Sequence, residues 1–159
     1  MKRETLFLKV TLVIMALPIL ALCIFVVPLI SKFFVELVPE WSVLQYPFLV
    51  GLYATALIYF AALYQTMKLL TYIDRNTAFS EASVSVLKKI KLCAVSIGTL
   101  YVLFMPLLFK MGDADDAPGI IVIGTGIIFG CVVIAVFAAV LQRLLQNAIV
   151  IKSENDLTV

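Results

Sequence analysis

The sequence predicts an all-α integral membrane protein built as a four-helix bundle, and three observations lead to this prediction. The chain is 64% hydrophobic and 14% charged with a mean hydropathy of +1.14, whereas a soluble domain is about half apolar and about a quarter charged. Its apolar residues fall into four runs, each close to the ~20 residues that cross a bilayer. One long polar stretch, residues 68–91, separates two runs from the other two. All of residues 1–159 are expected to form a single four-span domain.

The first predicted span covers residues 10–30, which contain no charged residue and follow a basic N-terminal head. This run is longer than the apolar core of a signal peptide, and no small-residue cleavage motif ends it, so we expect a retained anchor. Pro18 and Pro28 each remove a backbone hydrogen bond from a helix. A kink, or an early end of the helix near Pro28, is therefore expected.

The second predicted span covers residues 47–67. Pro47 is suited to its first turn, where a backbone N–H has no intrahelical partner, and the helix is expected to continue beyond the membrane to about Ile73. Trp41 lies in the connector before this span. An amphipathic indole ring there is typical of the headgroup level of a membrane.

A short amphipathic cytoplasmic helix is predicted between the second and third spans. Ser80 has the features of an N-cap, and Glu81 would complement the positive end of the helix. Val84 and Leu87 would then share one side of the helix, with the lysines largely on another. We expect this basic amphipathic segment to lie against the inner leaflet.

The third span is predicted at residues 92–109 and the fourth at residues 119–142, with a tight acidic loop between them. The three loop carboxylates do not have the spacing of an EF-hand, so the loop is interpreted as a solvated turn. In the fourth span, Gly126 and Gly130 have the four-residue spacing that lets membrane helices approach closely. Packing inside the bundle is the favoured interpretation, and homodimerisation is the alternative.

The distribution of lysine and arginine predicts the orientation of the chain. If both termini and the central connector are inside the cell, ten of the twelve basic residues lie inside, and Lys32 and Lys110 lie outside. Basic residues collect on the cytoplasmic side of membrane proteins. The prediction is therefore an N-in, C-in topology in the cell membrane.

Few residues with catalytic or metal-binding chemistry are present. The chain contains no histidine, its three cysteines lie singly in three different spans, and no span has a charged residue near its middle. Histidine is the commonest general base and metal ligand, and charges inside spans mark the pathways of ion-coupled pumps. We expect no catalytic, cofactor or metal site, and a net charge of +2 gives no indication of direct nucleic-acid binding.

Several short segments, spread over the whole chain, resemble a known family. They are Lys2-Arg3 with residues 6–9, Ala61 to Tyr64, residues 68–74, Ala78-Phe79-Ser80, residues 115–120, and the ending Ile151 to Val159. In these segments the chain resembles the DUF2975 family of bacterial membrane proteins. The resemblance implies a four-helix membrane protein of Gram-positive bacteria, often encoded beside a small helix-turn-helix regulator. It supplies no catalytic or ligand-binding residues.

These observations favour an interaction or regulatory protein that docks a cytoplasmic partner, such as a small DNA-binding regulator. The alternative function is a small transporter, channel or immunity-type component that acts as an oligomer. The candidate residues for docking are the charged residues of the central connector and the tail, and contact of the lysines with anionic membrane lipid is the competing interpretation. The candidate docking residues are Lys68, Arg75, Lys88, Lys89, Lys91, Glu154 and Asp156.

Overall fold

The computed structural model describes residues 2–157, and helices account for nearly all of them. In chain order the elements are α1 (Lys2–Ala21), the π-helix η1 (Leu22–Val26), α2 (Val27–Leu37), the 3₁₀-helix η2 (Pro39–Leu44), α3 (Gln45–Asp74), α4 (Glu81–Ala114) and α5 (Gly119–Leu157). Four helical stretches are long and apolar enough to cross a membrane: residues 2–37, 39–74, 81–114 and 119–157. The prediction of an all-α protein with four helices able to span a membrane is therefore confirmed.

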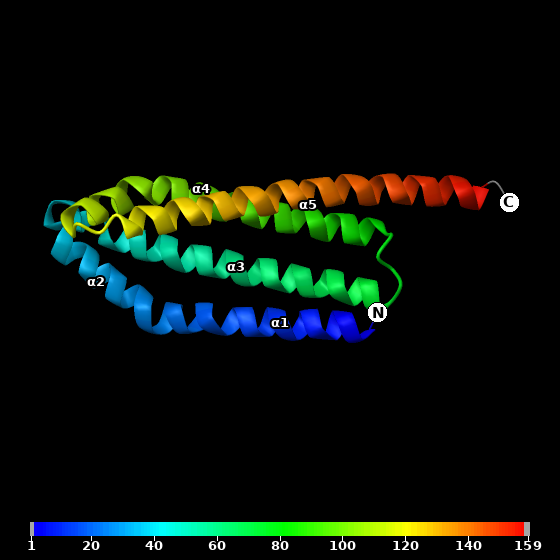
Figure 1. The fold of residues 1–159 in the computed structure, drawn as a ribbon, viewed down its shortest axis with the longest axis horizontal. Coiled ribbons are helices and arrows are strands. Elements are labelled where there is room, and N and C mark those ends of the chain that lie inside the picture. Colours follow the sequence, from blue (N-terminus) through cyan, green and yellow to red (C-terminus); the bar gives the residue numbers. More distant parts are fainter. Residues whose placement is uncertain (1, 158–159) are drawn as a thin grey trace.

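The helices run alternately up and down, so the chain has two distinct ends (Figure 1). One end holds the start of α1, the connector between α3 and α4, and the end of α5. We call it the basic end, because the ten basic residues that the sequence assigns to one side belong to these segments. We call the opposite end the aromatic end, after the phenylalanine cluster described below.

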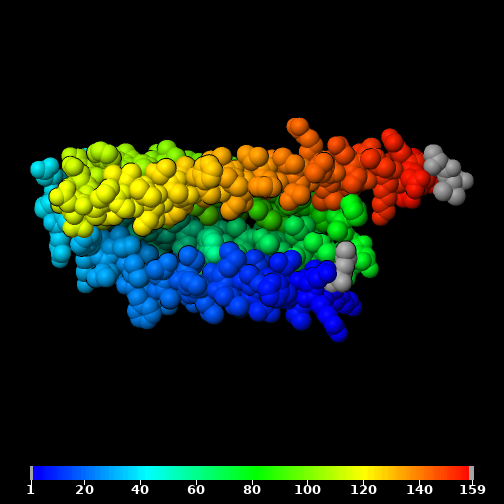
Figure 2. Space-filling view, in the orientation of Figure 1, coloured from blue at the N-terminus to red at the C-terminus, as the bar shows by residue number. Residues whose placement is uncertain are grey.

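The helices pack as an open row in the order α1, α3, α4, α5 rather than as a closed bundle. The most extensive pairing joins α4 to α5, followed by α3 with α4, and α1 packs on α3. In Figure 2, side chains of α3 and of part of α4 are visible between α1 (blue) and α5 (yellow to red), and the rest of α4 lies behind α5. Helices α1 and α5 therefore form the two edges of the row.

The aromatic end contains the core that holds α2, α3 and α4 together. Phe34 of α2 and Phe48 of α3 are 0% and 1% exposed, with ring centroids 5.4 Å apart. Phe104 of α4 packs edge-on against Phe48 at the same centroid distance. Val38 and Met111 complete this buried cluster. Edge-to-face and tilted ring pairs add to the stabilisation that burial provides.

The first span bends at a π-helical turn that precedes Pro28. The N–H of Val27 donates to the carbonyl of Leu22, five residues back. The carbonyl of Cys23 would accept from residue 28 in the same pattern, but proline has no N–H. The Tyr53 hydroxyl on α3 donates to this carbonyl at 3.1 Å instead. The expected irregularity near Pro28 is thus present, whereas Pro18 lies inside α1 without ending it.

Cap geometry defines the ends of α3 and α4. After α3, Asn76 has a φ of 56°, and the N–H of Thr77 donates to the carbonyl of Tyr72 at 2.9 Å. After α4, Asp116 has a φ of 52°, and the N–H of Ala117 donates to the carbonyl of Gly112, also at 2.9 Å. Both arrangements are Schellman caps. The acidic loop between α4 and α5 thus provides the C-terminal cap of α4.

The glycines that make close contacts within the chain are not the two that the sequence favoured. A Cβ added at Gly126 or Gly130 would meet nothing within 4 Å, so the interpretation that these two glycines pack inside the bundle is wrong. At Gly124 an added Cβ would lie 2.8 Å from Leu108 Cδ1, and at Gly51 it would overlap the Phe104 ring. The difference arises because Gly126 and Gly130 lie on a side of α5 that no other helix within residues 2–157 covers.

Candidate docking surface at the basic end

The helices of the basic end are longer than a membrane span requires. Helix α3 ends at Asp74, α4 begins at Glu81 and α5 ends at Leu157, whereas the predicted spans end at 67, begin at 92 and end at 142. At 1.5 Å per residue these extensions are about 10 to 23 Å long. The basic end therefore presents ordered helical surface beyond the expected membrane boundary.

The predicted short amphipathic helix is the first part of α4. Ser80 is the N-cap, as predicted, and its hydroxyl accepts from the N–H of Ser83 at 3.4 Å. No separate helix forms, because α4 continues without a break into the third span, and no glycine or proline interrupts residues 81–97. The apolar residues Val84 and Leu87 are 5% and 6% exposed. They are buried in the protein, which corrects the expectation that this side lies against the inner leaflet.

Lys88 and Lys89 are exposed on the opposite side of this helical segment. Their backbone is held in place by the buried Val84, Val86 and Leu87 on the same few turns. Within residues 2–157 neither lysine takes part in an ion pair, since the one salt bridge there joins Lys9 to Asp74. These two ammonium groups are therefore available for an anionic partner.

The remaining candidate residues are spread over three elements. Lys68 is half-buried near the end of α3, with its ammonium 5.9 Å from the centroid of the Tyr64 ring. Arg75 is exposed at the C-cap of α3, and Lys91 is half-buried on α4. Glu154 and Asp156 are exposed on the last turns of α5.

The described residues of the tail are helical. Residues 152–157 are the final turns of α5, and this part of the helix projects past the other helices of the basic end (Figure 1). Residues 158 and 159 lie outside the described part of the chain. The connector and the tail thus lie at the same end of the molecule. The acidic side chains of the tail, however, belong to the last turns of α5, which extend past the connector (Figure 1).

Sequence reasoning missed a polar contact at the basic end. Lys9 Nζ of α1 lies 2.6 Å from Asp74 Oδ2 at the end of α3, and the Thr5 hydroxyl donates to Asp74 Oδ1. These hydrogen bonds, first from Lys9 and then from Thr5, lower the pKa of the Asp74 carboxyl, which lies beyond the expected span. The sequence held one indication of this contact. Lys9 directly precedes the first apolar run, and Asp74 is the first acidic residue after the second apolar run.

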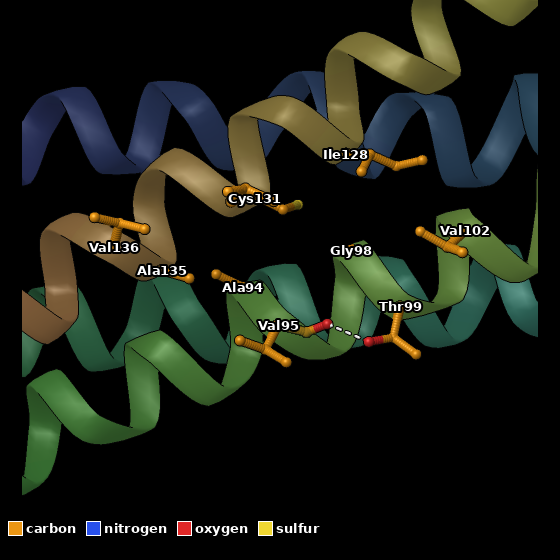
Figure 3. Close-up of a pocket in the computed structure, with 10 residues that line it drawn as sticks. Ala94, Val95, Gly98, Thr99, Val102, Ile128, Cys131, Ala135 and Val136 are labelled. Atoms are coloured by element: carbon orange, nitrogen blue, oxygen red, sulfur yellow. Dashed lines mark hydrogen bonds between the residues drawn. The ribbon is translucent and has the colours of Figure 1, made fainter.

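A groove between α4 and α5 lies away from these charged residues. It has a volume of about 340 Å³ and is lined by small and branched apolar residues, among them Gly98, Val102, Cys131 and Ala135 (Figure 3). Its one hydroxyl, that of Thr99, donates to the Val95 carbonyl of its own helix at 2.8 Å. Within residues 2–157, no group of three His, Cys, Asp or Glu side chains could hold a metal ion.

Comparison with known proteins agrees with this architecture. The model of the family described as "Protein of unknown function (DUF2975)" matches residues 29–159. The chain is 56% identical over 158 residues to the "Uncharacterized membrane protein YoaS" of Bacillus subtilis (strain 168), and the match covers 99% of both chains. No solved structure matches the chain. With four membrane-spanning helices and this relative, the protein is a multi-pass membrane protein, and it belongs to the DUF2975 family.

Proposed function

We propose that this protein is a membrane anchor whose basic end docks a soluble cytoplasmic protein, such as a small DNA-binding regulator. Bound to the anchor, the regulator is kept at the membrane and away from its operator until it is displaced. The observation that supports this proposal best is the pair of exposed lysines on α4, Lys88 and Lys89, whose helix is fixed by buried residues on its other side.

The geometry suits protein recognition because the charges are carried on ordered helices. A docking surface on a rigid element loses less conformational entropy on binding than a flexible loop does. Lys88 and Lys89 supply positive charge, and Glu154 and Asp156 supply negative charge on the projecting part of α5. A partner with a complementary charge pattern would be steered to this end and oriented there.

Anionic lipid is the competing ligand for the two lysines. A lysine near an anionic membrane surface gains about 1 kcal/mol from it. Lys88 and Lys89 precede the predicted third span at residue 92 by four and three residues, so lipid and protein can both reach them. The two ligands differ in how strictly they depend on these two positions. A partner protein would require these two positions specifically, whereas the membrane attracts any basic residue at the same depth.

The test measures, in cells that carry each variant, the membrane-bound fraction of the small helix-turn-helix regulator that the family resemblance implies is encoded beside this protein. Lys88→Glu/Lys89→Glu should release most of the regulator into the soluble fraction, and deletion of residues 153–159 should do so separately. Lys2→Glu/Arg3→Glu makes the same change of charge at exposed positions on α1 and should retain the regulator. The amount and insertion of the anchor are checked for every variant.

Two outcomes would contradict the docking function. The regulator could be equally membrane-bound with the wild-type anchor and with Lys88→Glu/Lys89→Glu, or it could be soluble in the presence of the wild-type anchor. Either result would favour the alternative, in which the protein acts as an oligomeric transporter, channel or immunity-type component.

A further inference from the structure

We propose that α5 pairs in parallel with α5 of a second copy of this chain, along one stripe that runs from the membrane into the cytoplasm. We call this the α5 stripe. It consists of Gly126, Gly130, Leu141, Leu144, Ala148 and Ile151. The pairing goes beyond the docking function and does not depend on a regulator being bound.

The spacing of these residues places them on one side of the helix. Leu141, Leu144, Ala148 and Ile151 follow one another at intervals of three, four and three residues. Such alternation of three and four is the pattern of the contact positions in a coiled coil. Arg143, Gln146 and Asn147 occupy intervening positions, so the apolar spacing is not a consequence of a wholly apolar segment.

Lipid cannot cover the whole α5 stripe. The helix begins at Gly119, and about 20 residues from there cross the hydrocarbon core. Ile151 lies nine residues beyond the predicted end of the span at 142, which is about 13 Å along the helix axis. Leu144 and Ile151 are nonetheless 58% and 65% exposed in the single chain. A monomer would leave this part of the stripe in the headgroup region and in water.

The membrane half of the stripe is shaped for close approach. Gly126 and Gly130 face away from the rest of the chain, since an added Cβ at either would meet nothing within 4 Å. Glycines at this spacing let two helix backbones come close enough for extensive van der Waals contact within lipid. Because α5 is an edge helix that packs on α4, the residues of this side are exposed or half-buried in the single chain.

A second copy is the occupant that covers both halves of the stripe. A soluble helix could cover the part that projects from the membrane but not the glycines inside it. The occupant must therefore be a membrane helix that continues into the cytoplasm at the same depth, and the 39 residues of α5 meet this requirement. Two copies inserted in the same orientation, related by a two-fold axis along the membrane normal, place each stripe residue opposite its counterpart.

The test is oxidative cross-linking of the full-length protein in native membranes. The three native cysteines are replaced by alanine, and a single cysteine is then introduced by Ile151→Cys in the stripe or by Val150→Cys as the control. Val150 is 55% exposed and adjacent in sequence, but it lies about 100° around the helix. Ile151→Cys should give mostly disulfide-linked dimer, at least five times more than Val150→Cys.

A second pair of variants tests the membrane half of the stripe. Gly126→Ile and Gly130→Ile, added to the Ile151→Cys chain, should each lower dimer formation several-fold. Both positions are open in the single chain, so the amount of inserted monomer should stay unchanged. Equal cross-linking at positions 150 and 151, dimer formation that is insensitive to both isoleucines, or cross-linking only to a different protein would overturn the proposal.

Discussion

The two edges of the helix row are attached in different ways. At one edge, the arm formed by α1, η1 and α2 (residues 2–37) packs less extensively, and its contacts include a buried ring, two tyrosine hydroxyls and an ion pair. Phe34 is buried at the aromatic end, Tyr53 and Tyr59 donate to carbonyls of the arm at 3.1 and 3.2 Å, and Lys9 pairs with Asp74 at the basic end. At the other edge, α5 packs closely along α4.

Close packing at the α5 edge comes from small residues. A Cβ added at Gly98 of α4 would lie 3.3 Å from Cys131 Cβ, and Ala138 is 4% exposed. In a membrane, the hydrophobic effect does not drive helices together, because the lipid tails are as apolar as the side chains. Close approach of the backbones and interhelical hydrogen bonds hold the helices together instead. The comparison teaches that the arm combines less extensive packing with a few identifiable ring and polar contacts, whereas the α5 edge depends on continuous packing. Single substitutions should therefore separate them.

The largest expected effect is loss of the arm's buried anchor. Phe34→Ala removes a fully buried ring that contacts Phe48, and such truncations cost about 3 to 5 kcal/mol. Thermal unfolding of the protein in mild detergent should show a strongly lowered midpoint. The neighbouring Phe33, which is 38% exposed, provides the control, and Phe33→Ala should change the midpoint little. Equal effects of the two substitutions would contradict the aromatic-end core.

Adding bulk between α4 and α5 should have the next largest effect. Gly124→Leu places a side chain where Leu108 and the Met105 sulfur already lie within 3.1 Å of a Cβ. Overpacking of this kind costs about 1 to 3 kcal/mol. The same midpoint measurement should show no comparable loss for Gly119→Leu, since no atom lies within 4 Å there. A harmless Gly124→Leu would mean that the α4–α5 pair is not closely packed.

A smaller effect is expected from Tyr53, whose hydroxyl donates to the Cys23 carbonyl in the π-helix η1. Tyr53→Phe leaves the Cys23 carbonyl without its donor, and a hydrogen bond contributes about 0.5 to 1.5 kcal/mol. Pro28→Ala supplies a backbone N–H close to the same carbonyl, so Tyr53→Phe should cost less in that background. A double-mutant cycle in detergent measures this coupling. Strict additivity of the two substitutions would show that the hydroxyl does not compensate for the proline.

The smallest expected effect belongs to the ion pair at the basic end. Hydrogen bonds from Lys9 and Thr5 lower the pKa of Asp74, so this carboxylate stabilises the fold fully above its unfolded pKa, about 3.9. The contribution is lost as pH falls through the lowered pKa of the folded state. Asp74→Asn should thus slightly lower the unfolding midpoint at pH 7, and the difference from wild type should shrink in acid below about pH 3.9.

The control for this pH dependence is Asp113→Asn, which removes an exposed carboxylate at the aromatic end. Its midpoint should follow that of the wild type at every pH. A difference between wild type and Asp74→Asn that stays constant down to the most acidic conditions would rule out the proposed role of the Asp74 carboxylate.

The sequence predicted the features that depend on local composition. The four spans follow from the length of the apolar runs, the N-cap at Ser80 from the residues around it, and the irregularity near Pro28 from its missing N–H. The helix ends were predicted less well. Apolar length indicates where lipid lies, whereas a helix continues into water until a cap such as Asn76 or Asp116 ends it.

The features that depend on which helix faces which could not be predicted from one sequence. All seven glycines have the same intrinsic properties, and the neighbours alone decide that Gly124 is packed and Gly126 is open. The contact between Lys9 and Asp74 joins residues 65 positions apart. The inner-leaflet position expected for residues 81–91 failed for the same reason, because an apolar stripe does not indicate whether lipid or protein will cover it.

A soluble regulator can reach this protein at its basic end only if that end lies in the cytoplasm. The most direct measurement is labelling of single cysteines by a membrane-impermeant maleimide, in chains whose native cysteines are replaced by alanine. Ser85→Cys lies at the basic end and Asp113→Cys at the aromatic end, and both positions are exposed. The charge distribution predicts that Asp113→Cys is labelled in cells with an intact plasma membrane, and Ser85→Cys only after permeabilisation. Labelling of Ser85→Cys in intact cells would place the basic end outside and contradict the docking function.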